Sequence, residues 1–179
     1  QFNDSNLLID FIADRLKVYL RADGIRHDLI SAAFSVGNED DLNRLIARVK
    51  ALREFLLSDD GKNLLIAHRR AANILAIESK KDDISYASEP ESKLFEVDQE
   101  RNLFVALSDI RNSLSEFLKK EDFTEAMQRL ATLRRPVDDY FENVTVNSEK
   151  TTLRENRLKT LSLIVNTMNT VADFSSVEN

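Results

Sequence analysis

The scarcity of glycine and proline constrains this fold more than any other feature of the sequence. Only 3 glycines and 2 prolines occur among 179 residues, far below the usual share of each. Sandwiches and barrels need many tight turns, and those turns depend largely on these two residue types. The sequence therefore predicts an all-α protein, a bundle of about seven or eight helices.

Apolar periodicity supports the helical prediction. Within residues 98–120, large apolar side chains recur every three or four positions, at Leu103, Leu107, Ile110 and Leu114, which is the spacing of one helix face. Comparable stripes predict helices at about 6–21, 26–36, 40–57, 62–78, 123–133 and 151–171.

Two segments interrupt this pattern. Residues 80–91 contain lysines, aspartates, serines and Pro90, and they form the best linker candidate. The bundle is therefore expected to consist of two helical units, at 1–83 and 91–179. The second interruption is Pro136, which either biases Arg135 toward an extended conformation or begins a new helix.

Composition argues against several kinds of chemistry. The chain has no cysteine and only 2 histidines, so no metal site is expected. No glycine-rich phosphate loop and no nucleophile–base pair is present. The net charge of −6 disfavours general nucleic-acid binding, which would need a local basic cluster. No membrane span or signal peptide is expected, and the start at Gln1 predicts a piece of a longer chain.

Residues 14–21 and 24–30 closely resemble a segment of the β subunit of bacterial-type glycyl-tRNA synthetase. They read Asp-Arg-Leu-Lys-Val-Tyr-Leu-Arg and Gly-Ile-Arg-His-Asp-Leu-Ile. Further blocks match in the family's order at 40–42, 48–52, 69–75, 122–123, 133–141, 153–158 and 171–175. The resemblance thus extends from one end of the chain to the other.

The resemblance implies the C-terminal part of that subunit, with an all-helical anticodon-binding domain named for an Asp-Ala-Leu-Arg signature. This sequence has Thr151-Thr152-Leu153-Arg154 at that place, so only the Leu-Arg pair is kept. The family assignment implies residues 91–179 as the domain and residues 1–83 as a linking helical region. It also implies a non-catalytic, cytoplasmic fragment without its own cofactor.

The family further implies the partners. These are glycine tRNA, the ligase α subunit that activates glycine, and the remainder of the β subunit; neither a membrane nor DNA is expected. The whole ligase would use ATP with magnesium. The alternative interpretation is a protein-interaction module that docks against the rest of the ligase with little direct contact to RNA.

Arg134 and Arg135 are the first candidates for tRNA contact, because paired guanidiniums can hold phosphates or bases. The alternative is that they complement the dipole at a helix C-terminus. Asp138 could accept a hydrogen bond from the N4 amine of an anticodon cytosine, although helix capping after Pro136 also explains it. Tyr140 and Phe141 fit base stacking or the core, and the core is the preferred interpretation.

A second group of candidates lies near the start of the last predicted helix. Arg154 and Arg157 are three residues apart and share a face, whereas Lys159 points elsewhere. The free N–H groups at that end favour anions, and the alternative is ion pairing with Glu149 or Glu155. If these arginines converge with Arg134 and Arg135, they would form a positive groove.

The third group is Arg69 and Arg70, which follow His68 on a largely apolar predicted helix. Lys80 and Lys81 extend this basic cluster in sequence. The cluster could contact a tRNA stem or another domain, or it could be the solvated edge of a packed surface. In the same helix, Asn73 is expected to be a buried amide.

Overall fold

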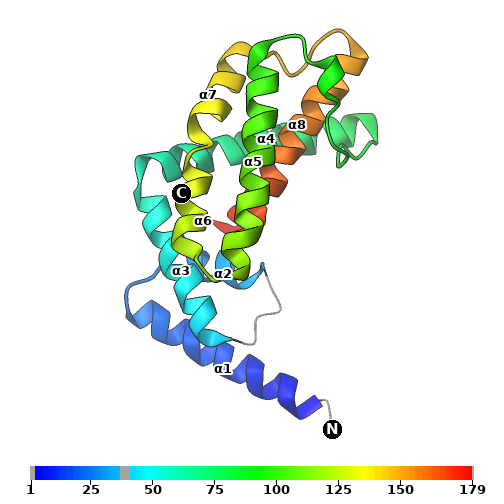
Figure 1. Ribbon diagram of the computed structural model, residues 1–179. Coiled ribbons are helices and arrows are strands. Elements are labelled where there is room, and N and C mark those ends of the chain that lie inside the picture. Colours follow the sequence, from blue (N-terminus) through cyan, green and yellow to red (C-terminus); the bar gives the residue numbers. More distant parts are fainter. Residues whose placement is uncertain (1–2, 37–40, 179) are drawn as a thin grey trace.

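A computed structural model of the chain describes residues 3–36 and 41–178, with side chains from residue 11 onward (Figure 1). Throughout these residues the regular structure is helical, without strands. The α-helices are α1 (Asn3–Ala22), α2 (His27–Phe34), α3 (Leu42–Leu57), α4 (Asp59–Asp82), α5 (Asp98–Lys119), α6 (Phe123–Ala131), α7 (Arg134–Asn143) and α8 (Thr151–Asn169). Two 3-10 helices are η1 (Ser92–Leu94) and η2 (Phe174–Ser176). The predicted all-α bundle is confirmed.

Side-chain caps explain where several helices begin. The Asp41 carboxylate accepts hydrogen bonds from the backbone N–H groups of Asn43 and Arg44, at 2.9 and 3.2 Å. Asp122 does the same for Glu125 at the start of α6, at 3.1 Å. Such caps satisfy N–H groups that the helix itself leaves unpaired. Residue 40, where the sequence predicted the start of α3, lies outside the described residues.

Ser58 is the single residue between the end of α3 and the start of α4. Its hydroxyl accepts from the backbone N–H of Gly61 at 3.0 Å, so α4 begins at Asp59 rather than near residue 62 as predicted. A Cβ on Gly61 would lie 1.9 Å from the carbonyl oxygen of Phe55. Glycine is therefore required here because the end of α3 crosses closely over the first turn of α4.

Pro136 lies within the first turn of α7, after Arg134 and Arg135. Proline is tolerated in the first turn because the backbone N–H that it lacks would have no partner within the helix. The predicted interruption before Pro136 is confirmed, since α6 ends at Ala131. The extended conformation considered for Arg135 is wrong, because Arg135 is already helical.

The helix α4 joins the two halves of the chain. It packs against α3 from the first half and against α7 and α8 from the second, and it crosses the molecule behind α5 in Figure 1. The helix α5 in turn packs against α6, α7 and α8. The division into units at 83 and 91 stays a prediction, and within the described residues the core is continuous across that boundary.

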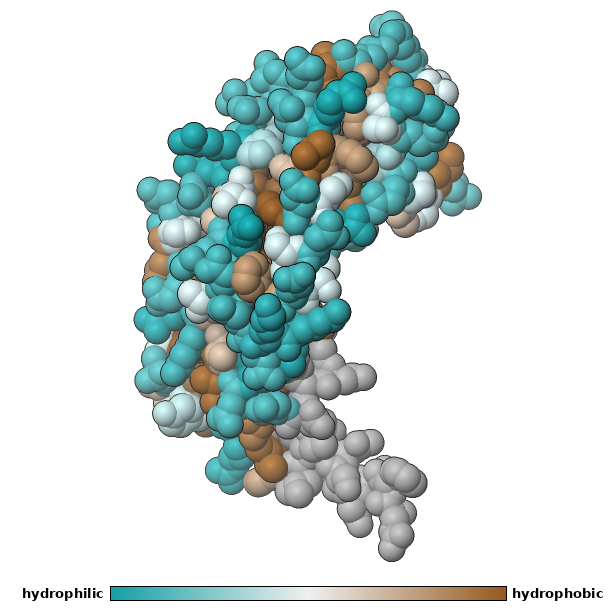
Figure 2. Space-filling view, viewed as in Figure 1, coloured by the Kyte–Doolittle hydropathy of each residue, from teal (hydrophilic) through white to brown (hydrophobic). Residues whose placement is uncertain are grey.

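The surface is mostly hydrophilic on the face that Figure 2 shows, with apolar side chains scattered among polar ones. The helix α1 lies at one end of the molecule and packs against α2 (Figure 1). None of the described helices combines the length and the apolar character that crossing a bilayer requires.

Candidate nucleic-acid interface

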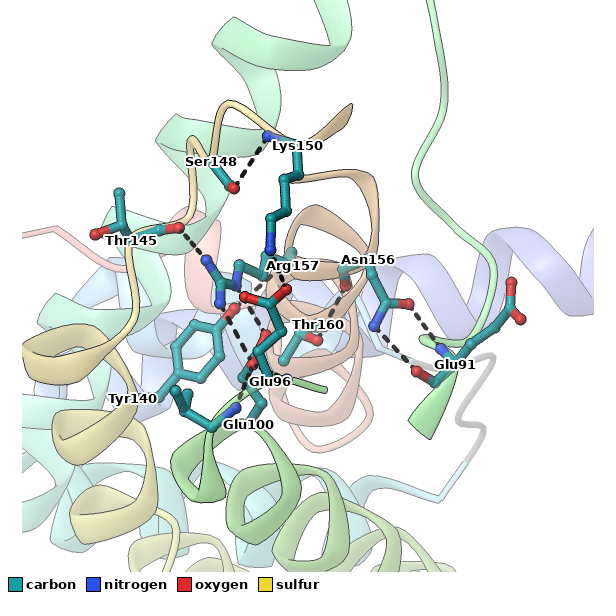
Figure 3. Close-up of polar contacts among 11 residues, drawn as sticks. Glu91, Glu96, Glu100, Tyr140, Thr145, Ser148, Lys150, Asn156, Arg157 and Thr160 are labelled. Atoms are coloured by element: carbon teal, nitrogen blue, oxygen red, sulfur yellow. Dashed lines mark hydrogen bonds and ion pairs between the residues drawn. The ribbon is translucent and has the colours of Figure 1, made fainter. Parts of the chain in front are cut away.

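Arg157 on α8 is buried, and its guanidinium forms part of the core of the bundle (Figure 3). Its Nε donates to Glu100 Oε1 of α5 at 2.8 Å, and its Nη1 donates to the carbonyl oxygen of Thr145 at 2.8 Å. Burial alone would raise the pKa of Glu100, but Arg157 and the backbone N–H groups of Glu96 and Val97 hold that pKa below its ordinary value. Arg157 thus ties α8 to α5.

Arg154 is also engaged within the protein. Its Nη2 pairs with Glu78 and, at 2.6 Å, with Asp82, both on α4. These hydrogen bonds raise the pKa of the guanidinium above its ordinary value. Ion pairing was one of the two interpretations from sequence, but the partners come from α4 rather than from Glu149 or Glu155.

Lys159 is half-buried on α8 beside the segment that precedes α5. Lys93 pairs with Glu91 at 2.7 Å and lowers the pKa of that carboxyl, and the charge of Lys159 adds to the effect. No residue in the described ranges forms an ion pair with Lys159 itself. The expectation that Lys159 points away from Arg154 and Arg157 fits this placement.

Arg134 and Arg135 open α7 rather than close a helix, so the interpretation as a helix C-terminal charge is wrong. The positive end of a helix dipole disfavours cations, and two acids compensate for Arg134. It pairs with Asp60 of α4 at 3.0 Å and with Asp138 at 3.4 Å. Arg135 is exposed and has no partner among the described residues.

The expected groove of four converging arginines does not form. Arg154 and Arg157 are held by acids of α4 and α5, while Arg134 and Arg135 begin α7. Contact of these residues with RNA stays a prediction, and their ion pairs explain Arg154 and Arg157 without it.

The basic cluster on α4 divides between the interior and the surface. The Nη2 of Arg69 donates to the carbonyl oxygen of Val177 at 2.6 Å and so holds the C-terminal segment. His68 is 1% exposed, and its Nε2 lies 3.0 Å from Asn169 Oδ1. Burial lowers the pKa of His68, although Asn169 and Asp173 oppose this effect.

His68 is expected to make the protein less stable as the pH falls below about 6.5, the ordinary pKa of histidine. The unfolded chain takes up a proton there that the buried ring resists, so the unfolding free energy decreases toward low pH. Urea unfolding at about pH 7.5 and about pH 5.5 measures the effect. Two charges act on the ring, Asp173 and Arg69. Against the effect of burial, the pKa of Asp173 is lowered by its hydrogen bonds to Ser175 and Ser176, so this carboxylate stays ionised in this window.

The matched control is His27, which is exposed. His68→Gln should flatten the pH dependence between about pH 7.5 and about pH 5.5, whereas His27→Gln should leave it unchanged. A slope that persists in His68→Gln would assign the effect to other groups.

Arg70 behaves differently, because its guanidinium lies over the ring of Phe141 on α7, 4.4 Å from the centroid. It makes no hydrogen bond or ion pair with a described residue. Beside it is a hollow of about 180 Å³, here called the α4–α7 furrow. Its lining residues are Asn63, Ile66, Ala67, Arg70, Asp138, Phe141 and Glu142. The furrow thus brings together predicted residues from both halves of the chain.

The outer face of α4 extends the positive charge of Arg70 along the helix. Lys62, Arg70, Lys80 and Lys81 are all exposed, and the one acid between residues 62 and 81 is Glu78, which is buried against Arg154. Arg70, Ile77 and Lys81 share a helix face at spacings of seven and eleven residues. Two of these lysines are ion-paired within α4, Lys62 with Asp59 and Lys81 with Glu78, each at 3.9 Å. A molecule with net charge −6 therefore carries one long helix face on which basic side chains predominate.

A larger hollow of about 540 Å³ lies between α3 and α6. Its walls are mainly small or apolar side chains, and Lys50 stands there beside Glu54 and Asp60. This hollow therefore lacks the excess of positive charge that an RNA backbone requires.

The sequence did not predict the burial of two residues at the surface of α4 and α7. Asn73 was expected to be buried but is exposed on the outer face of α4, and Phe141 was assigned to the core but is only half-buried. Tyr140 is fully buried, as predicted. The available signal was the run from residue 62 to residue 81 with a single acid.

The described residues thus form an all-helical bundle with a basic helix face and an arginine–aromatic contact. The sequence model of the DALR anticodon binding domain family matches residues 64–174. The chain therefore belongs to this family. The matched region begins within α4, so it includes the outer face of α4 as well as α5 to α8.

The chain is also similar to proteins named glycine–tRNA ligase beta subunit. It is 51% identical over 172 residues to the one from Rhodospirillum centenum, which covers 96% of this chain and 24% of the relative. It is 43% identical over 175 residues to that of Paracoccus denitrificans, covering 98% and 26%. The chain thus spans about a quarter of the length of these curated relatives, and the resemblance to that subunit is confirmed.

Proposed function

We propose that this chain binds tRNA through the anticodon arm and positions glycine tRNA for aminoacylation on the ligase α subunit. The observation that carries the proposal is the match to the anticodon-binding family over residues 64–174. The similarity to glycine–tRNA ligase β subunits supports glycine tRNA as the partner.

The outer face of α4 is the proposed docking surface for the RNA backbone. Arg70, Lys80 and Lys81 supply its charge, and no exposed acid lies between them. RNA is repelled by the acidic remainder of the chain, so this face would orient the RNA as well as bind it. Arg135 is exposed at the start of α7 and would add positive charge, whereas Asp60 and Asp138 already compensate for Arg134.

The chain contributes binding and not chemistry in this proposal. ATP, magnesium and glycine would be bound by other parts of the ligase, with the α subunit and the remainder of the β subunit as protein partners. The proposed location is the cytoplasm, where aminoacyl-tRNA is used.

Neutralising Lys80 and Lys81 tests the proposal. The variant Lys80→Gln/Lys81→Gln is expected to weaken binding of a glycine tRNA roughly tenfold, because two phosphate contacts are lost. The slope of log affinity against log salt should become shallower by about 2. Fluorescence anisotropy with labelled tRNA, at several salt concentrations, measures both quantities.

The matched control is a second lysine pair at a helix end. Lys119 and Lys120, at the end of α5, are exposed and lie outside the α4 face. Lys119→Gln/Lys120→Gln should leave the affinity nearly unchanged. Absence of tRNA binding at low salt would contradict the proposed function, and equal losses in both pairs would contradict the α4 surface.

A further inference from the structure

The α4–α7 furrow has the size of a subsite for a single ring. Its volume of about 180 Å³ is below the range of about 300–1,000 Å³ that whole small-molecule ligands occupy. Two flat side-chain groups line one wall, the Arg70 guanidinium and the Phe141 ring, with the guanidinium carbon 4.4 Å from the ring centroid. The exposed side chain of Ile66 adds apolar surface at the same hollow. A flat, partly apolar group fits such a wall better than a phosphate does.

The polar side chains of the furrow are mostly hydrogen-bond acceptors. Asp138 and Glu142 are carboxylates one helical turn apart on α7. One oxygen of Asp138, Oδ2, already lies 3.4 Å from Arg134 Nε, whereas Glu142 forms no ion pair with a described residue. Asn63 donates one N–H of Nδ2 to the carbonyl oxygen of Asp59 at 2.8 Å, which leaves its Oδ1 available as an acceptor and one N–H available as a donor. Carboxylates repel phosphate, and they accept hydrogen bonds from amines. The furrow thus combines a stacking wall with acceptors for an amino group.

The stacking wall suits the flat face of a nucleobase, and the acceptors suit its hydrogen-bonding edge. Arginine planes and aromatic rings stack on unpaired bases, and acceptors at the edge distinguish bases by their exocyclic groups. Cytosine presents an N4 amine, whereas uracil presents an O4 acceptor that a carboxylate would repel. The cationic face of α4 lies beside the furrow and would bind the phosphates that flank the base.

We propose that the α4–α7 furrow holds one unpaired nucleobase that carries an exocyclic amine, cytosine in an anticodon loop, stacked on Arg70 and hydrogen-bonded by Asp138 and Glu142. The inference rests on the proposed function, since it assigns a base to the same interface. Arg70 and Phe141 give affinity for any base, while the two carboxylates give the preference for an amine.

The test compares hairpins of a glycine-tRNA anticodon arm in which single loop cytosines are replaced by uracil. Binding to the full 179-residue chain is measured by fluorescence anisotropy. One replacement is expected to weaken binding about tenfold. In Asp138→Asn/Glu142→Gln the two hairpins should bind within about twofold of each other, because carboxamides can also donate to uracil O4. The cytosine hairpin should keep most of its affinity.

Two controls make the assignment specific. Glu54→Gln changes the carboxylate of the larger α3–α6 hollow and should leave the preference for cytosine intact. Arg70→Met should weaken both hairpins several-fold, whereas Arg21→Met on α1 should weaken neither. Circular dichroism confirms that the variants, all at exposed or half-buried positions, remain folded.

The outcomes separate this inference from the proposed function. If no hairpin and no glycine tRNA binds, the proposed function fails as well. If RNA binds and the carboxamide variant still prefers cytosine about tenfold, the furrow does not read the base and the inference is overturned. A preference lost in Glu54→Gln would place the base in the other hollow and would also overturn it.

Discussion

Replacing Glu100 with alanine is expected to lower the free energy of unfolding by about 3–5 kcal/mol, because it leaves a buried charge without a partner. The Arg157 side chain is 8% exposed, and Glu100 is its acid partner at 2.8 Å. The same carboxylate accepts hydrogen bonds from the backbone N–H groups of Glu96 and Val97, at 2.9 and 3.1 Å. The substitution therefore also removes the cap of α5. Urea unfolding followed by circular dichroism measures the loss.

An exposed ion pair nearby provides the control. Glu96 pairs with Lys150 at 2.6 Å, with side chains that are 48% and 68% exposed. Glu96→Ala should cost less than about 1 kcal/mol, since solvent screens such pairs. Removing both buried partners, in Glu100→Leu/Arg157→Leu, should be less destabilising than Glu100→Ala alone. If Glu100→Ala costs no more than Glu96→Ala, the buried pair does not stabilise the bundle.

The local pattern of apolar residues was sufficient to predict most helices of the fold and the faces that they bury. In α5, the residues predicted to share one face, Leu103, Leu107, Ile110 and Leu114, are all buried. Periodicity records which side of a helix is apolar, and that side must pack. Helix ends were less well predicted where caps decide them: Ser58 and the close packing at Gly61 extend α4 toward its start.

The candidate site depended on contacts that periodicity does not record. Arg154 and Arg157 do share a face of α8, yet their acid partners lie on α4 and α5, 57 to 76 residues away in sequence. Whether an arginine is free for RNA depends on which acids the tertiary structure brings to it. The stack of Arg70 on Phe141 likewise joins α4 to α7, so neither residue alone predicted the furrow.

Phe174→Ala is expected to destabilise the protein by about 3–5 kcal/mol, the usual cost of removing a buried aromatic ring. Phe174 in η2 is fully buried, and its ring centroid lies 6.0 Å from that of Phe55 and 5.7 Å from that of His68. The ring therefore anchors the C-terminal segment to α3 and α4. Alanine would leave a cavity between these helices, because the side chains around it cannot all collapse inward.

The effect should also reach the outer face of α4, because the same segment holds Arg69 through the carbonyl oxygen of Val177 at 2.6 Å. Phe11→Ala is the control: Phe11 is 57% exposed on α1, and its loss should change the unfolding free energy by no more than about 0.5 kcal/mol. Urea unfolding compares the two variants. Equal midpoints would mean that η2 is not part of the cooperative core, and the α4 face would then have to be held in place by α7 and α8 alone.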